Sequence, residues 1–354
     1  MRVVIAPLEF KGTLTALEAA GAIHRGLAAI LPEATFDFAP MADGGPGTLA
    51  VLSPVIGGQT HSTMVSDALG RPVNAAWLSY GGDAAVIETA QAIGLSLIPP
   101  FDRDIENATS RGAGELVRTA LELGSRRLFV AVGGSATNDG GRGMLEALGL
   151  TSDPSTGGLV LKGLDPRIKD SEFTVLADVR NPLLGDEGAT MVYASQKGAK
   201  SRQLPHLERH MAQFADEAES AFRVAARHDP GSGAAGGLGF AFRLLGARIL
   251  PGAEVVANFL GLAKRLQQAD ALFVGEGSFD LQSSWGKGVS YLLDLARRLH
   301  IPVYGIFGQI RGSTLGFEDV VSLEEQAGSG EAAMAGAEQE VQRAAYRLGA
   351  RMSR

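Results

Sequence analysis

A nine-residue stretch, GGSATNDGG at 133–141, constrains the fold of this chain more than any other feature of its sequence. Four glycines and four small polar residues separate the apolar run 128–132 from the helix-like segment 142–149. Glycines at a strand-to-helix junction let backbone N–H groups point toward a ligand at the positive end of the helix, which suits phosphate. The stretch therefore predicts either an anion-binding βα turn or a tight turn capped by Asn138 or Asp139.

The first forty residues predict parallel strands. The β-branched run 2–7 ends in a proline, and a helical pattern of apolar residues follows Thr15, with Glu18 in the capping-box position. A second strand-like run at 35–40 completes a βαβ unit. Such a unit indicates a parallel sheet with helices on its faces.

The pattern changes in the middle of the chain. Three short strand-like runs at 59–66, 73–79 and 84–89 are joined by turn residues that leave no room for helices, so we expect antiparallel pairing. Helix and strand patterns then alternate again: a helix at 112–123 capped by Thr109 or Ser110, strands at 126–132 and 173–178, a long polar helix at 202–227, and strands at 271–274 and 303–308.

These patterns predict an α/β protein with two α/β domains. The two ends of the chain look alike and differ from the middle, so we expect one domain built from residues 1–56 and 240–354. A second, mixed-sheet domain of residues 57–239 would be inserted in it. A length of 354 residues, 45% of them hydrophobic, is enough for two cores.

Charge and composition exclude several classes of partner. The net charge of −7 disfavours nucleic acid and acidic membranes, and no apolar run reaches the roughly 18–20 residues that cross a bilayer. The N-terminus lacks the pattern of a secretory signal, and the absence of cysteine excludes disulfides and thiol nucleophiles. We expect a cytoplasmic protein that acts on small molecules, with a homodimer left open.

Lysines are scarce and gather beside glycines. The chain has seven lysines against 25 arginines, and four of the seven precede a glycine: Lys11, Lys162, Lys197 and Lys287. Because arginine carries the ordinary surface charge here, a lysine at a flexible turn suggests a functional role. Chance explains Lys162, whereas the surroundings of the other three favour a site.

Further glycine turns carry acids or lysines at the expected strand ends. They are FKG (10–12), MADGGPGT (41–48), LADVRNPL (176–183), SQKGA (195–199), GAAGGLG (233–239) and GEGSFDLQSSWGKG (275–288). Each alone is more readily a turn than a site, but so many together indicate ligand binding. Lysines and amides for phosphate, with carboxylates for Mg²⁺ or a hydroxyl proton, are the groups that phosphoryl transfer needs.

Other chemistries find less support. The 133–141 stretch is not the GxGxxG fingerprint of a nicotinamide-dependent oxidoreductase, and the chain has no Walker A sequence. His206 and His210 are four residues apart, but the HExxH order and a third ligand are missing, so solvated surface is the better interpretation. A serine hydrolase would need a GxSxG sequence, which is absent.

Together these stretches resemble the bacterial glycerate kinase family, whose members phosphorylate D-glycerate with ATP. The resemblance covers nearly the whole chain in order, and GGSATNDGG is highly specific to that family. The other matching stretches are AP..FKG, MADGG.GT, ATS.G.GEL (108–116), DV.NPL, QKGA, GAAGGLG and GEG..D.QS..GK. The resemblance implies a discontinuous flavodoxin- or Rossmann-like domain with an inserted α/β domain, and a reaction in a cleft between them.

The turns and the resemblance together suggest roles for named residues. Catalytic roles are expected for Lys11, Asp43, Asp178 and Lys197, with Asp43 or Asp178 engaging the substrate hydroxyl or Mg²⁺. Binding of ATP is expected from Gly133, Gly134, Ser135, Thr137, Asn138, Asp139, Gly236, Gly237, Glu276, Asp280 and Lys287. The predicted reaction is phosphorylation of D-glycerate. The alternatives are a kinase of another small hydroxy acid and a nucleotide-binding paralogue without activity.

The chain also departs from the family pattern beside the expected site. Leu8 and Glu9 stand where the family has Asp-Ser before FKG; Pro46 replaces a glutamate, Ala113 a threonine and Ser278 an arginine. Several of the lost groups are charged, so these positions bear on substrate and activity rather than on fold.

Overall fold

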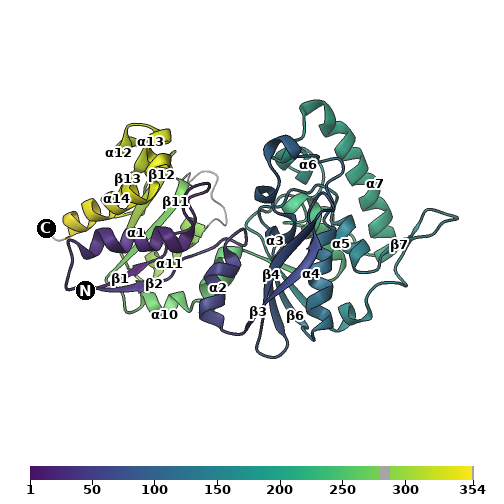
Figure 1. Ribbon diagram of the computed structural model, residues 1–354, viewed down its shortest axis with the longest axis horizontal. Coiled ribbons are helices and arrows are strands. Elements are labelled where there is room, and N and C mark those ends of the chain that lie inside the picture. The colour runs from purple at the N-terminus through teal and green to yellow at the C-terminus, as the bar shows by residue number, and fades with distance from the viewer. Residues whose placement is uncertain (280–287, 353–354) are drawn as a thin grey trace. The chain divides into compact units, whose positions relative to one another are not determined.

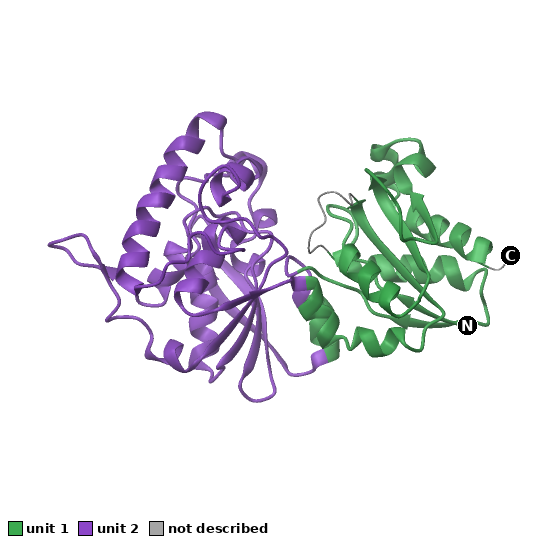
Figure 2. Cartoon of the chain, turned by 180° about the vertical axis from the view of Figure 1, so that it is seen from behind, with its two compact units in different colours: residues 1–43, 50–55, 253–354 green, residues 44–49, 56–252 purple. Residues whose placement is uncertain are grey.

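The computed structural model describes residues 1–279 and 288–352, and the chain divides into two compact units (Figures 1 and 2). Unit 1 comprises Met1–Asp43, Ala50–Val55 and Ala253–Arg354, and unit 2 comprises Gly44–Leu49 and Ile56–Gly252. Both ends of the chain thus contribute to unit 1, and nearly all of unit 2 is one continuous segment. That the units are two domains, one inserted in the other, stays our proposal.

Unit 1 contains a five-stranded parallel sheet in the order β2-β1-β11-β12-β13. Its strands are β1 (Arg2–Ile5), β2 (Thr35–Phe38), β11 (Ala271–Phe279), β12 (Val303–Ile310) and β13 (Asp319–Ser322). Counted along the chain within this sheet, the strand order is 2-1-3-4-5, as in flavodoxin-like folds. Successive strands are added on one side of β1 and then on the other, so the topological switch point lies between β1 and β11. Ligands of such sheets bind beyond the carboxyl ends of the strands at that switch point.

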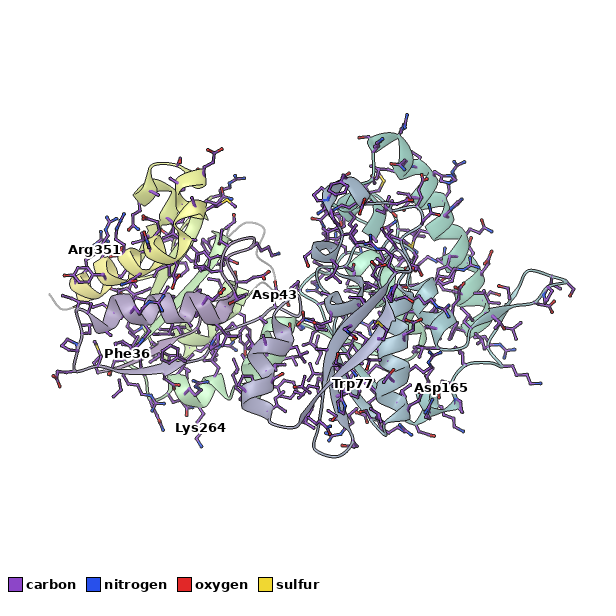
Figure 3. All side chains as sticks on the ribbon, viewed as in Figure 1. Phe36, Asp43, Trp77, Asp165, Lys264 and Arg351 are labelled. Carbon is purple, nitrogen blue, oxygen red and sulfur yellow. The ribbon has the colours of Figure 1, made fainter. Side chains whose placement is uncertain are left out.

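Helices bury their apolar faces against this sheet. The predicted capping box is present at the start of α1, where the Thr15 hydroxyl accepts from the Glu18 N–H and the Glu18 carboxylate accepts from the Thr15 N–H. The Phe36 ring on β2 contacts His24 of α1, with 4.9 Å between ring centroids (Figure 3). The helices that lie wholly or mostly in unit 1 are α1 (Ala16–Ala28), α2 (Thr48–Ile56), α9 (Gly252–Phe259), α10 (Leu262–Leu266), α11 (Gly288–Arg298), α12 (Leu323–Ala327), α13 (Gly330–Ala335) and α14 (Ala337–Met352).

Unit 2 contains a six-stranded mixed sheet in the order β10-β9-β6-β5-β4-β3. Its strands are β3 (Gln59–Ser66), β4 (Pro72–Tyr80), β5 (Ala84–Glu88), β6 (Arg127–Ala131), β9 (Glu172–Leu176) and β10 (Arg248–Leu250). β3, β4 and β5 pair antiparallel, which confirms the expectation from their short turns, and β5, β6, β9 and β10 are parallel. Trp77 of β4 is fully buried and donates its indole N–H to Thr63 Oγ1 at 3.0 Å (Figure 3).

Short helices and turns surround the sheet of unit 2. The α-helices are α3 (Ala90–Ile93), α4 (Arg111–Glu122), α5 (Arg142–Ala147), α6 (Ala189–Tyr193), α7 (Leu204–Phe222) and α8 (Leu238–Leu244). The 3₁₀ turns are η1 (Leu95–Leu97), η2 (Pro100–Asp102), η3 (Pro166–Asp170), η4 (Ser195–Lys197), η5 (Ser201–Gln203) and η6 (Ala234–Gly237), and β7 (Thr151–Ser152) pairs with β8 (Leu159–Val160). Among the helices of the described residues, none has both the length and the apolar composition that a membrane crossing needs.

The end of one helix and the boundaries of the units differ from expectation; among the latter, residues 44–49 lie in unit 2. The helix expected to reach residue 227 ends at Phe222, because Arg223 adopts a left-handed conformation (φ 57°) and the Glu219 carboxylate then accepts the N–H groups of Ala226 and Arg227. Residues 240–252, assigned to the terminal domain from the sequence, lie in unit 2. They belong there because α8 packs on the core of unit 2 and β10 pairs with β9.

Candidate functional site

The carboxyl ends of the parallel strands in unit 2 bring several predicted residues to one edge of the sheet. β5 ends at Glu88, β6 leads into the 133–141 loop, and β9 leads to Asp178. The Val132 N–H bonds to the Leu176 carbonyl at 3.4 Å, so the loop and the Asp178 segment leave the sheet as neighbours. This edge is where open α/β sheets bind ligands.

Asp139 caps two helices. Its Oδ2 accepts hydrogen bonds from the N–H and the hydroxyl of Ser110, both at 2.8 Å, and from the Gly143 N–H at 3.1 Å. Its Oδ1 accepts from the Gly141 N–H at 3.0 Å. The carboxylate thereby joins the starts of α4 and α5, where a negative charge is favourable. Ser110 occupies the predicted N-cap position of α4, but its hydroxyl bonds Asp139 and the Met144 N–H rather than α4 itself.

Lys197 is buried against the same loop. It is 4% exposed, and its ammonium donates to Ser135 Oγ at 3.1 Å and to the Thr137 carbonyl at 2.8 Å. Burial lowers the pKa of Lys197 to about 8, and the charge of Asp139 opposes that shift. Lys197 ends η4, directly before the left-handed Gly198, and its ammonium is bonded to two oxygens of the 133–141 loop.

The loop also buries polar groups that have no partner among the described residues. Within the described residues, the backbone N–H groups of Ser135, Thr137 and Asn138 meet no hydrogen-bond acceptor, and Thr137 Oγ1 and Asn138 Oδ1 also lack a partner. All three residues are less than one-tenth exposed. Native proteins rarely leave buried N–H groups unpaired unless a ligand or water satisfies them. The loop can therefore offer three amides and one hydroxyl to an anion close to the Lys197 ammonium.

A second glycine turn, 234–237, packs against this loop. The Gly140 N–H bonds to the Gly236 carbonyl at 3.0 Å, and a Cβ at Gly236 would lie 1.9 Å from the Thr137 carbonyl oxygen. Ala235, Gly236 and Gly237 are all left-handed, with φ of 54°, 68° and 96°. The two glycines predicted to bind ATP thus permit a close approach of two turns, which a larger residue would prevent.

The GSGAAG letters at 231–236 also fit GxGxxG. A dinucleotide-binding turn follows a strand and opens a helix. Here the stretch follows an irregular segment after α7 and leads through η6 into α8. The letters therefore match the fingerprint without its structural setting.

The 44–49 segment packs on the 133–141 loop and is held by Glu88 of β5, an acid to which the sequence analysis assigned no role. Pro46 lies against Gly134, where a Cβ would be 2.7 Å from Pro46 Cγ. Glu88 is 2% exposed; its carboxylate accepts the Leu49 N–H at 2.9 Å and the Gln91 side-chain amide at 3.1 Å. Glu88 thus ties the 44–49 segment to the end of β5. An acid at the end of the wholly apolar run AAVI is the sequence signal that could have identified it.

Asp178 is half-buried two residues beyond the end of β9. Its Oδ1 accepts the N–H of Gly252 at 2.6 Å, at the start of α9. Asp178 therefore stands at the ligand-binding edge of the unit 2 sheet, with one oxygen engaged by the backbone.

Unit 1 gathers three predicted residues at its own carboxyl edge. Lys11 is exposed in the turn after β1, and a Cβ on Gly277 would lie 3.2 Å from the backbone nitrogen of Lys11. Glu276 precedes Gly277 on β11, so Lys11 and Glu276 are neighbours at the switch point. Asp43 follows β2 at the same edge, because the Met41 N–H bonds to the Pro7 carbonyl at 2.8 Å (Figure 3).

The remaining predictions have different outcomes. Asp280 and Lys287 lie outside the described residues. His206 and His210 are exposed on α7 with their rings 4.0 Å apart. Asp43 and Asp178 belong to different units, and their sharing of one cleft stays a prediction.

The carboxylates suit Mg²⁺ that arrives with a nucleotide. Mg²⁺ usually takes one or two carboxylates together with phosphate oxygens and waters. Across residues 1–279 and 288–352, no three His, Cys, Asp or Glu side chains converge as a metal site. Asp43 in unit 1 and Asp178 in unit 2 each carry carboxylate oxygens of the kind that Mg²⁺ accepts as ligands.

Comparison with known proteins covers nearly the whole chain. The profile of the Glycerate kinase family matches residues 3–353. The glycerate 2-kinase of Escherichia coli (strain K12) is 39% identical over 326 residues, covering 88% of this chain and 86% of that protein. The glycerate kinase of Bacillus subtilis (strain 168) is 40% identical, covering 88% and 85%. A crystal structure of a Salmonella typhimurium LT2 protein assigned as glycerate kinase 2 matches with a TM-score of 0.82 at 35% identity, covering 100% of this chain and 98% of that one.

Proposed function

The chain belongs to the glycerate kinase family, and on that premise we propose that it transfers the terminal phosphoryl group of ATP to a hydroxyl of D-glycerate. The product is a phosphoglycerate, and the other product is ADP. Phosphoryl transfer depends mainly on positioning and on neutralising charge, so it needs neither thiol nor histidine.

The observation that carries this proposal is the set of buried donors in the 133–141 loop that have no acceptor within residues 1–279 and 288–352. The N–H groups of Ser135, Thr137 and Asn138 can hold phosphate oxygens, with the positive charge of Lys197 close by. Donors arranged before the reaction stabilise developing negative charge without reorganising. We assign Ser135, Thr137 and Asn138 to that role through their backbone N–H groups, whereas both oxygens of Asp139 are engaged in capping.

The acids and the exposed lysine complete the proposal. Asp43 or Asp178 takes the proton of the attacking hydroxyl or binds Mg²⁺, and Lys11 neutralises charge on the transferred group. Mg²⁺ bound with ATP would supply further charge neutralisation. Glu276 stands next to Lys11 at the switch point of unit 1, which supports a ligand at that edge.

Two departures from the family pattern support altered specificity as the second candidate. Leu8 is buried and packs on Gly288, where a Cβ would lie 2.3 Å from Leu8 Cδ2. Pro46 contacts the anion loop itself at Gly134. Apolar side chains therefore stand where the family carries carboxylates, so a related small hydroxy acid is the alternative substrate.

The deciding experiment measures ADP release by the purified protein with ATP, Mg²⁺ and either D-glycerate, L-glycerate or a panel of small hydroxy acids. Turnover with D-glycerate is expected, and phosphorus NMR of the product distinguishes the 2-phosphate from the 3-phosphate. EDTA in excess of Mg²⁺ should abolish turnover. Turnover only with another acid would move the assignment to that acid. ATP binding without any turnover would establish the non-catalytic alternative.

Variants then test the acids. Asp43→Asn and Asp178→Asn should each lower kcat/KM by about a hundredfold or more if they act on the hydroxyl proton or on Mg²⁺. Asp170→Asn, at an exposed acid of η3, is the matched control and should leave turnover unchanged. Full activity in both Asp43→Asn and Asp178→Asn would show that the site lies elsewhere.

A further inference from the structure

Lys197 has an environment that distinguishes it from an ordinary phosphate-binding lysine. Two of the three N–H donors of its ammonium are used by the loop itself, on Ser135 Oγ and the Thr137 carbonyl. The side chain is 4% exposed, so the loop and its surroundings exclude most solvent from it. A lysine that meets an incoming ligand directly keeps its ammonium accessible and its donors free.

The two bonded oxygens flank the unpaired donors. Ser135 and Thr137 each carry one of the free N–H groups, and the carbonyl held by Lys197 belongs to the peptide group whose N–H is that of Asn138. Because a peptide group is planar, fixing the Thr137 carbonyl also fixes the direction of the Asn138 N–H. The ammonium thus controls how the Asn138 amide points.

Several other contacts hold the loop beside those of Lys197. The Ala136 N–H bonds to the Ile93 carbonyl at 2.8 Å, and the Gly140 N–H bonds to Gly236. The side chain of Asn138 donates to Thr190 Oγ1 at 3.1 Å, and the Asp139 carboxylate is held at the starts of α4 and α5. The Lys197 ammonium binds Ser135 and Thr137, the residues on either side of Ala136.

We infer that Lys197 is a positioning residue, whose ammonium holds Ser135 and Thr137 of the 133–141 loop so that the N–H group of Asn138 points at the anion. This inference rests on the proposed function for the identity of the anion. The positive charge of the Lys197 ammonium also adds to the electrostatic attraction of the loop for an anion. Asp139 is the charged group that acts on the Lys197 ammonium within the described residues, and the lowered pKa of Lys197 makes that charge sensitive to mildly alkaline pH.

The test compares Lys197→Met, which keeps the length but removes charge and donors, with Lys197→Arg, which keeps both. Lys162→Met, at an exposed lysine of the same unit, is the matched control. We expect kcat/KM for ATP-dependent phosphorylation to fall about a hundredfold in Lys197→Met, since a displacement of about 1 Å has that effect. Lys197→Arg should retain activity within about tenfold of wild type. It should also lose the alkaline decline in kcat/KM, because a guanidinium does not deprotonate there.

A double variant separates positioning from direct contact with the ligand. If Lys197 acts through the loop, then Ser135→Ala with Lys197→Met loses no more activity than Lys197→Met alone. Independent losses that multiply would overturn the inference, because they mean that each group meets the ligand by itself.

Hydrogen exchange gives a readout that needs no substrate. The Ala136 amide should exchange faster in Lys197→Met than in wild type and Lys197→Arg, while amides of β5 and β6 keep their protection. Unchanged exchange at Ala136 would overturn the inference even in an active enzyme. Absence of turnover in the wild type would instead refute the proposed function and leave the exchange result to decide the role of Lys197.

Discussion

At the scale of single residues, burial changes the chemistry of Lys197. An exposed lysine has an ordinary pKa of 10.5, whereas burial lowers that of Lys197 to about 8, against the opposing effect of Asp139. Below about pH 8 the folded and unfolded chains both carry the proton, and the cost of burying the charge is at its full value. Between about pH 8 and 10.5 the unfolded chain binds more protons than the folded one, so this group makes stability rise with pH.

This sign gives a prediction for stability. The free energy of unfolding of the wild type, relative to that of Lys197→Met, should increase by up to about 3 kcal/mol between pH 7 and pH 10. Urea denaturation of both proteins at pH 7, 8.5 and 10 measures it. A difference that does not change with pH would mean that the lysine is not buried as a charge.

Asp139 gives a second prediction at this scale. Its carboxylate accepts four hydrogen bonds, three from backbone N–H groups and one from the Ser110 hydroxyl. In Asp139→Asn one oxygen becomes a donor that faces other donors, and the negative charge at two helix starts is lost. We expect a loss of about 1–3 kcal/mol in stability, seen as a lower Tm. Asp170→Asn is again the control, and equal Tm values for the two variants would contradict the capping role.

At the scale of elements, the site is made by turns that pack on each other rather than by helices or strands. Gly236 shows the steric condition most clearly, since a Cβ would lie 1.9 Å from the Thr137 carbonyl oxygen. Gly246 has a similar backbone, with φ of 83° against 68°, but a Cβ there would meet nothing within 4 Å. Substituting Gly246 therefore tests backbone strain alone, whereas substituting Gly236 tests backbone strain together with close packing.

The paired substitution is therefore informative. Gly246→Ala should cost about 1 kcal/mol, the penalty for alanine in a left-handed conformation. Gly236→Ala should cost clearly more and also lower activity, because the 234–237 turn must move away from the 133–141 loop. Thermal unfolding and kcat/KM of both variants measure this difference. Equal losses would show that the two turns do not depend on their contact.

At the scale of the whole molecule, each unit has its own sheet and its own core. Unit 2 buries an apolar cluster against its six-stranded sheet, and the cluster draws on β4, β5, β6 and β9 together with α4, α7 and α8. Unit 1 buries a separate cluster between its parallel sheet and α1 and α14. A segment that contains all the strands of its sheet and its own hydrophobic core can fold alone.

We accordingly expect residues 44–252 to fold when produced by themselves. Circular dichroism should show a cooperative thermal transition, and a proton–nitrogen NMR spectrum should show dispersed amide signals. The fragment should not phosphorylate glycerate, because Lys11, Asp43 and Glu276 belong to unit 1. An unfolded fragment would mean that unit 2 depends on unit 1 for its stability.

The sequence by itself determined the local elements and the family. Apolar periodicity and capping residues identified α1, and the absence of room for helices between 59 and 89 identified the antiparallel strands. These features depend on neighbours within a few residues, which is the range over which propensity, capping and turn chemistry act. The GGSATNDGG motif and the other glycine turns, which occur along the chain in the order typical of the family, were enough to identify the family.

Only the tertiary structure decided what the groups in those turns do. Burial of Lys197, the engagement of Asp139 by Ser110, and the anchoring of the 44–49 segment by Glu88 join residues 29 to 62 positions apart. Whether an amide is paired and whether an ammonium is solvated depends on which distant segments pack around it. A lysine beside a glycine is therefore recognisable in sequence as a turn residue, while its pKa and its hydrogen-bond partners are set by the folded protein.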